Sequence, residues 1–322
     1  MVVNTPYDDV FKTLLIDCKD LILPLINEVF GEHYSGNEKI SFRPNEHFLN
    51  RQNGEESERI TDTFFKIFSK EVKSYHFECQ STEDSTMVIR MFEYDAQIAL
   101  DNGKLSGSTL NVTFPHSAVL YLRSSRNTPD QMYVHMITPG GELTYPIQIL
   151  KLKNYSLDDI FDKHLFFLIP FYIFVHENRF QVYNENEQEC RELFKEFELI
   201  NRRLDELAQA GIINEYFKCT IIDMTKKVVQ NIAKKYDKVQ KGVNSIMGGK
   251  VLEYEAKDIL RKGIAEGISQ GISQGISQGF SQGQFQAYAD LVRDGLLSIS
   301  KAAERLNISV EDFEKKFKEY SN

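Results

Sequence analysis

Two carboxylates and one side-chain amide stand at spacings that a pair of neighbouring strands would bring together. Asp62 lies in the first of two short runs rich in aromatic and β-branched residues, and Glu78 and Gln80 end the second run. Such runs are typical of strands, and side chains two apart on a strand share a face. If residues 69–72 form the turn, residues equidistant from Lys70 face each other, which places Asp62 opposite Glu78.

The chemistry that this arrangement predicts is metal-dependent cleavage of a phosphodiester. Carboxylate and amide oxygens are the kind of ligand that Mg²⁺ selects. A cation held in this way polarises a phosphoryl group and activates water. The alternative interpretation is a solvated strand face, because short patterns of acidic residues often match by chance.

The composition is that of a globular protein with reduced cysteines. The chain has 322 residues and a formal net charge of −9, which argues against a protein that coats nucleic acid but not against a nuclease. The four cysteines are too scattered for a zinc site or a disulfide framework. There is no basic-then-apolar leader and no apolar run of about eighteen residues. We therefore expect a cytoplasmic protein with no membrane partner.

The pattern of apolar residues predicts an α/β or α+β fold over residues 1–180, with a mixed sheet flanked by helices. Helices are expected at 5–16, at 20–30 and from 156, a loop at 52–58, and strands at 60–67, 75–80, 117–123, 132–137 and 145–150. A further helix is expected after Gln80, with an apolar stripe from Met87 to Ile98 and an end at 101–103. Gly31 is expected to end the second helix, and Pro146 to place the last strand towards an edge of the sheet.

From residue 185 onward the sequence predicts helices alone. Within the helical region 185–262, residues 226–241 carry a local charge of +5, which suits a solvated helix face or, secondarily, a phosphate contact. Glycine recurs every fourth residue through 263–286, which suits either a self-associating helix or a linker. The tail, 287–322, predicts a small helical packing module capped at Ser309 rather than a DNA reader, because it has no basic stripe.

Taken in order, several segments resemble the recombination-promoting nuclease/putative transposase family, within the PD-(D/E)XK nuclease superfamily. The segments are 7–12, the strand with Asp62, 77–80, 90–94, 168–173, and the glycine repeat with its tail, so the resemblance covers nearly the whole chain. It implies a restriction-endonuclease-like core and Mg²⁺-dependent DNA cleavage with low sequence specificity, linked to recombination or mobile elements. Mn²⁺ can substitute for Mg²⁺, and no small-molecule cofactor is implied.

The resemblance also implies roles for individual residues. Asp62 and Glu78 would bind the metal, and Gln80 stands where the superfamily commonly has lysine. Because an amide supplies no positive charge to a transition state, Lys12 or Lys66 is expected to supply it. The remaining residues expected near the site, as acidic, phosphate or supporting contacts, are Asp8, Asp9, Arg90 and Tyr94.

Two functions follow from the sequence. The leading one is a DNA endonuclease that forms a homo-oligomer through its C-terminal helices, so that two protomers related by a twofold axis cut opposite strands. The rival is a catalytically inactive, nuclease-like interaction or assembly protein that uses the C-terminal repeat. The amide of Gln80 and the acidic net charge favour the rival.

Overall fold

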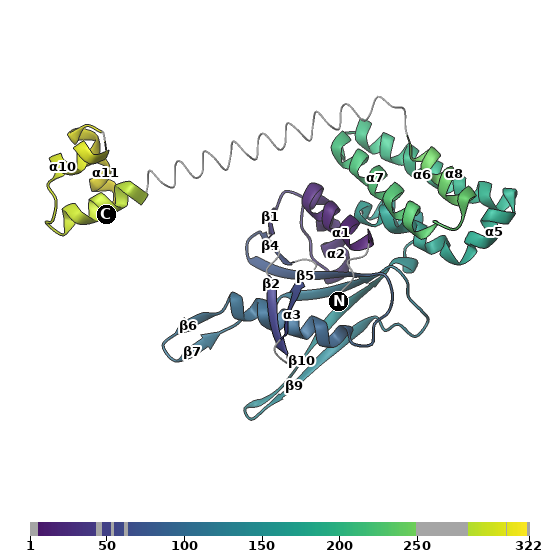
Figure 1. Cartoon of the computed structure of the whole chain (residues 1–322), viewed down its shortest axis with the longest axis horizontal. Coiled ribbons are helices and arrows are strands. Elements are labelled where there is room, and N and C mark those ends of the chain that lie inside the picture. The colour runs from purple at the N-terminus through teal and green to yellow at the C-terminus, as the bar shows by residue number, and fades with distance from the viewer. Residues whose placement is uncertain are drawn as a thin grey trace. The chain divides into compact units, whose positions relative to one another are not determined.

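The computed structural model describes residues 6–42, 47–52, 55–60, 64–248, 283–306 and 308–320. The described residues up to 248 form one compact unit, and those from 283 onward form a second. The first unit is a mixed α/β fold built on a six-stranded sheet (Figure 1). The coarse fold class that the sequence predicts, a mixed sheet with helices followed by a helical C-terminal region, is therefore confirmed.

The sheet has the strand order β1-β4-β5-β8-β10-β9. Its strands are β1 (Lys39–Phe42), β4 (Phe64–Phe68), β5 (Val72–Gln80), β8 (His116–Tyr121), β9 (Gln131–Thr138) and β10 (Gly141–Lys151). Strand β8 is parallel to both of its neighbours, β5 and β10, and the other pairs are antiparallel. Two separate hairpins are formed by β2 (His47–Gln52) with β3 (Glu55–Ile60) and by β6 (Lys104–Ser106) with β7 (Thr109–Asn111).

Two expectations about strands were wrong. The segment expected to be a loop, 52–58, contains most of β3, which pairs with β2. The strand with Pro146 is not at the edge, because β10 lies between β8 and β9. Pro146 is tolerated there because β8 pairs with β10 only from Gln148 onward, so the missing N–H costs no hydrogen bond to β8.

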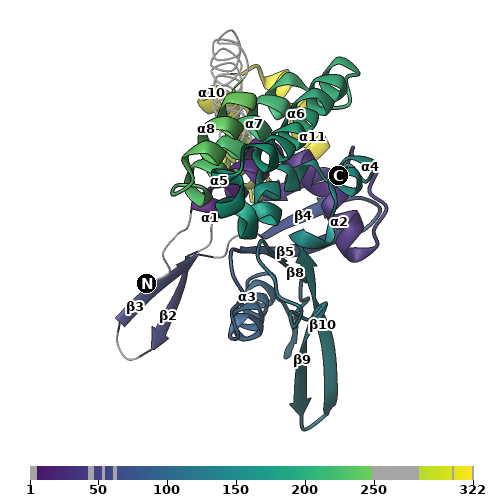
Figure 2. The ribbon, with the colours of Figure 1, turned by 90° about the vertical axis from the view of Figure 1, so that its right-hand side faces the viewer.

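Helices cover both faces of the sheet (Figure 2). The helices of the first unit are α1 (Pro6–Asp17), η1 (Lys19–Leu21), α2 (Ile22–Phe30), α3 (Met87–Asp101), η2 (Leu152–Asn154), α4 (Leu157–Asp162), η3 (Phe166–Arg179), α5 (Phe180–Glu185), α6 (Glu187–Gln209), α7 (Glu215–Ile232) and α8 (Asp237–Ile246). Helix α2 ends as expected at Gly31, whose φ of 65° is the left-handed conformation that glycine adopts without strain.

The two faces of β5 have different surroundings because side chains alternate along a strand. Phe77 and Cys79 point into the main core, which α1, α2, η3 and α6–α8 complete. On the opposite face, Met87 and Met91 of α3 pack on Val119 and other residues of β8 and β10. His76 and Glu78 belong to this second face, under α3.

The second unit is a small helical module. Residues 283–293 are helical, followed by α10 (Ile299–Leu306) and α11 (Val310–Tyr320). These helices enclose Phe313, which is fully buried, and Ser309 caps α11 by accepting from the Asp312 N–H at 3.0 Å. The expected cap at Ser309 is confirmed, whereas the glycine repeat up to residue 282 lies outside the described residues.

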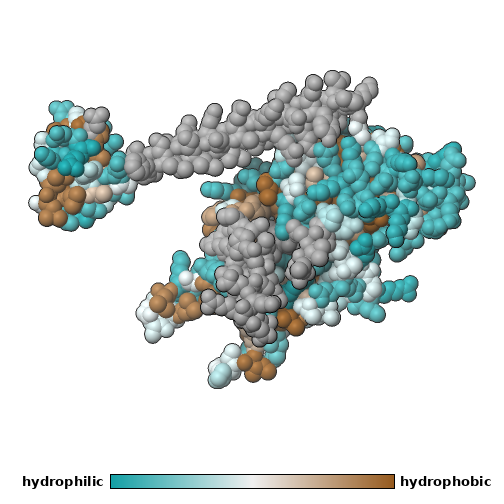
Figure 3. Space-filling view, viewed as in Figure 1, coloured by the Kyte–Doolittle hydropathy of each residue, from teal (hydrophilic) through white to brown (hydrophobic). Residues whose placement is uncertain are grey.

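The described surface of the first unit is apolar at the ends of two hairpins. Leu105 and Leu110 are exposed on β6–β7, and Ile137 and Leu143 are exposed near the tip of β9–β10, where Figure 3 shows brown patches. Among the helices in the described ranges, none is both long and apolar enough to cross a bilayer.

Candidate functional site

Strands β4 and β5 pair in the register that the sequence predicts. Phe64 lies opposite His76 and Phe68 lies opposite Val72, so the paired residues are equidistant from Lys70. A tight turn therefore sets the alignment of the two strands. Asp62 lies outside the described residues, and its place opposite Glu78 stays a prediction.

Glu78 lies in a buried chain of polar side chains near the end of β5. Its exposed fraction is 3%, and His76 and Asp95 are wholly buried. Because both partners of the imidazole are carboxylates, both of its ring nitrogens donate: Nε2 to Glu78 Oε1 at 3.2 Å and Nδ1 to Asp95 Oδ1 at 2.7 Å. Ser117 Oγ donates to the same Asp95 oxygen at 2.7 Å, and Tyr145 OH lies 3.5 Å from the other oxygen. The chain thus joins β5, α3, β8 and β10.

The two carboxylates determine the charge of the imidazole between them. Burial lowers the pKa of His76, but the hydrogen bonds and negative charges of Asp95 and Glu78 outweigh burial and raise the pKa to about 10. At neutral pH the centre of the site is therefore an imidazolium held between two acidic side chains.

Gln80 lies on the same face of β5 as Glu78 and is more exposed to solvent. Its side chain is partly exposed, and its Nε2 lies 3.5 Å from Glu78 Oε2. The backbone carbonyl of Gln80 accepts from the Leu122 N–H at 2.9 Å, which ties the end of β5 to β8. Glu78 therefore has one oxygen on His76 and the other towards Gln80.

The three α1 residues expected near the site lie on a helix that covers the other face of the sheet. Phe11 of α1 stacks on Phe77, with ring centroids 6.0 Å apart. Asp9 pairs with Lys227 of α7 at 3.6 Å. Asp8 and Lys12 are one turn apart and partly buried. Their approach to Glu78 stays a prediction.

The other expected residues lie on or beside α3, and of these Tyr94 contacts the polar network. Lys66 lies opposite Ser74 and donates to Asn102 Oδ1 at 2.8 Å, beside the end of α3. Tyr94 places its ring edge-on to His76, with centroids 5.9 Å apart. Arg90 lies 3.6 Å from the Asp84 carboxylate, and in the described ranges its Nε is among the few buried side-chain atoms without a hydrogen-bond partner.

Arg123, which the sequence analysis did not single out, binds the backbone directly after β5. Arg123 makes two hydrogen bonds to the Glu177 carboxylate, at 2.5 and 2.8 Å, and a third to the Ser81 carbonyl at 3.2 Å. Its guanidinium lies over the Phe174 ring, 4.7 Å from the centroid. Burial raises the pKa of the neighbouring Tyr7, against the opposing charge of Arg123. Through these contacts Arg123, which follows β8, connects η3 and α1 to the end of β5 next to Gln80.

The donor set at Glu78 suits a hard cation. Mg²⁺ uses one or two carboxylates and completes its shell with water and substrate oxygens, so it needs no dense protein cage. Within the part of the chain that the structure describes, no three His, Cys, Asp or Glu side chains converge as a metal cage. Glu78 supplies a carboxylate ligand of the right class, with the Gln80 amide beside it, and the second carboxylate of the prediction is Asp62.

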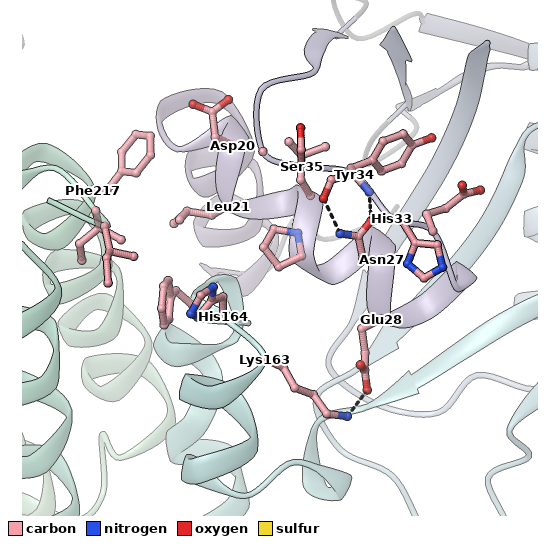
Figure 4. A pocket seen from close by; sticks show the side chains of 17 residues that line it. Asp20, Leu21, Asn27, Glu28, His33, Tyr34, Ser35, Lys163, His164 and Phe217 are labelled. Atoms are coloured by element: carbon pink, nitrogen blue, oxygen red, sulfur yellow. Dashed lines mark hydrogen bonds and ion pairs between the residues drawn. The ribbon is translucent and has the colours of Figure 1, made fainter. Parts of the chain in front are cut away.

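A pocket of about 590 Å³ lies away from these residues, between α2, the end of α4 and the start of α7. In Figure 4, Lys163 reaches Glu28, and Asn27 holds the Tyr34 backbone through two hydrogen bonds. The polar chain of β5 does not line it. This pocket is thus separate from the candidate site.

His76 and Asp95 were missed as site residues, although the sequence carried a signal for each. His76 is two residues before Glu78 and hence on its face, and Asp95 interrupts the apolar stripe of α3 four residues after Met91. Comparison with known proteins adds no further assignment: no family model, no curated protein and no solved structure matches the chain.

Proposed function

We propose that the protein is a Mg²⁺-dependent DNA endonuclease of low sequence specificity, of the recombination-promoting nuclease/putative transposase kind that its segments resemble. Asp62 and Glu78 hold the cation, and Gln80 lies beside it. The protein acts as a homo-oligomer through its C-terminal helices.

The observation that carries the proposal is the setting of Glu78. A carboxylate that is 3% exposed, among apolar neighbours, is costly unless it is paired. Here it is held by a buried imidazolium at the end of a strand whose pairing with β4 follows the expected register. Groups whose pKa is strongly shifted by a charged partner cluster at functional sites, and His76 beside Glu78 is such a group.

The residues divide the reaction between them. The bound cation supplies Lewis-acid polarisation of the scissile phosphate and a nucleophilic water. Glu78 presents its Oε2 towards the substrate side while His76 holds Oε1. The Gln80 amide orients water, and Arg90, with its buried Nε, contacts a substrate phosphate.

The test is cleavage of supercoiled plasmid in Mg²⁺ by the full chain. Wild type should nick the plasmid, and EDTA should stop it. Glu78→Gln and Asp62→Asn keep the side-chain shapes but remove the charges that bind the cation, so each should abolish nicking. Glu71→Gln, at the exposed turn of the same hairpin, is the matched control and should cut like wild type. Equal nicking by wild type and Glu78→Gln would refute the proposal.

The second candidate function is an assembly protein with an inactive core. The tail favours it, because residues 283–320 form a compact unit with a core of their own around Phe313. Light scattering measures the oligomeric state of the full protein and of a protein shortened to end at residue 250. Together with the plasmid assay, it distinguishes the two functions. An inactive wild type whose oligomer disappears with the C-terminal region would support assembly alone.

A further inference from the structure

We propose that His76 is a positioning residue for Glu78, and that Asp95 and Ser117 hold His76 in place. The inference rests on the proposed function, because it concerns how the protein presents the Glu78 carboxylate to a divalent cation. Its basis is the geometry of the buried chain of hydrogen bonds.

The hydrogen bonds to Asp95 and Glu78 allow the His76 ring a single orientation. Its ring is wholly buried, with one nitrogen 2.7 Å from Asp95 and the other 3.2 Å from Glu78. Tyr94 lies edge-on to the ring, at an interplanar angle of 75°. A flip of the imidazole would break both hydrogen bonds, so the ring is fixed by partners on two different elements, β5 and α3.

Asp95 is fixed in its turn. The Ser117 hydroxyl donates to the oxygen that also accepts from His76, and the Tyr145 hydroxyl lies 3.5 Å from the second oxygen. These partners come from β8 and β10, so three strands and one helix determine where Asp95 points. Because Asp95 is held in place, it fixes the His76 ring, and the ring in turn fixes the Glu78 carboxylate.

The consequence for Glu78 is that the two oxygens of its carboxylate are different. Oε1 is held by the imidazole, whereas Oε2 lies towards the partly exposed Gln80. A glutamate has three side-chain torsions, and fixing them before a ligand arrives lowers the entropic cost of binding. Carboxylates and imidazoles that orient a metal ligand typically change metal affinity by about tenfold to a hundredfold.

A purely structural role would not require buried, hydrogen-bonded charged side chains at this position. The surrounding face is apolar, with Met91, Val119 and Ile147 fully buried. Replacing a buried ion pair by well-packed apolar side chains is often neutral or stabilising. The cost of burying Asp95, His76 and Glu78 together is therefore best explained by how they orient the Glu78 carboxylate beside the partly exposed Gln80.

Two substitutions at His76 separate its two contacts. The amide of His76→Asn takes the place of Nδ1 and keeps the contact with Asp95, but no atom then reaches Glu78. The amide of His76→Gln takes the place of Nε2 and keeps a donor for Glu78. We expect Mn²⁺ affinity to fall by about tenfold or more in His76→Asn and to be largely retained in His76→Gln.

The measurement is titration of the full chain with Mn²⁺ alone, without DNA, with free Mn²⁺ followed by electron paramagnetic resonance. Asp95→Asn is a third variant that leaves Glu78 and His76 intact, and it should also weaken binding. Tyr133→Phe is the matched control, because it removes an exposed tyrosine hydroxyl of β9 that bonds Gln131 and not Asp95. Thermal unfolding in EDTA shows which variants fold.

The outcomes are distinct. Wild type that binds Mn²⁺, with Glu78→Gln that does not, supports the proposed metal site. In that case His76→Asn and Asp95→Asn binding within about twofold of wild type would overturn the positioning role alone. Equal loss of affinity in His76→Asn and His76→Gln, each with a lower unfolding midpoint, would assign His76 a structural role instead. Wild type that binds no Mn²⁺ would overturn both proposals.

Discussion

The buried imidazolium of His76 makes the stability of the metal-free protein depend on pH. Its pKa is about 10 in the folded protein, against an ordinary value of 6.5. Because the folded pKa is the higher one, the stabilisation is complete below pH 6.5 and is lost as the pH rises towards 10. Between these values the folded protein keeps a proton that the unfolded chain has released.

The magnitude follows from that one proton. The free energy of unfolding should fall by about 1.4 kcal/mol for each pH unit, or about 2 to 3 kcal/mol between about pH 7 and pH 9. His76→Gln removes the ionising group. The free energy of unfolding of wild type relative to this variant should therefore fall by that amount between about pH 7 and pH 9. His33→Gln, which removes an exposed imidazole, is the matched control and should follow wild type.

Equilibrium unfolding in urea and EDTA, followed by far-ultraviolet circular dichroism at several pH values, gives these free energies. The comparison with His76→Gln is needed because other groups also titrate near pH 9. Parallel pH profiles for wild type and His76→Gln would refute the charge assigned to the imidazole, and with it the two strong hydrogen bonds to Asp95 and Glu78.

Three further predictions concern the core, the amide and the basic surface. Phe77→Ala should lower the free energy of unfolding by about 3–5 kcal/mol, because the ring is fully buried against Phe11, and urea unfolding measures the loss. Gln80→Ala should slow plasmid cleavage by about a hundredfold while Mn²⁺ affinity stays near that of wild type, since the amide orients water. Replacing the exposed Lys234 and Lys235 by serine should weaken DNA binding irrespective of its sequence and reduce the salt dependence of the affinity, which filter binding at several salt concentrations measures.

The strand pair was predictable because its determinants are local. Phe65 and Ile67 flank Lys66, Phe77 and Cys79 flank Glu78, and a short turn then leaves one register that buries both apolar pairs. The apolar stripe of α3 and the glycine that ends α2 are local signals of the same kind. Such signals need no knowledge of the rest of the chain.

The contact between His76 and Asp95 was not predictable in this way. The two residues are nineteen positions apart, and they meet only because α3 lies across the face of β5 and β8. The angle of that helix depends on how Met87 and Met91 pack, which no short segment encodes. The same holds for Arg123, whose partner Glu177 lies fifty-four positions further along the chain.

The β2–β3 hairpin was missed for a different reason. Its strands are polar, with Glu55, Glu56 and Glu58 in one of them, so the apolar alternation that identifies strands is absent. The AsnGly pair at 53–54 is a hairpin signal in the sequence that could have corrected the expected loop.

The central claim is that Glu78, with Asp62, holds a divalent cation at the end of β5. Crystals of the full chain grown with Mn²⁺, measured at a wavelength where manganese scatters anomalously, test it most directly. We predict an anomalous peak with carboxylate oxygens of Glu78 and Asp62 at about 2.1–2.2 Å, and with Oε1 of Glu78 still bound to His76. An anomalous map with no peak at Glu78, or with manganese bound only elsewhere, would contradict the claim.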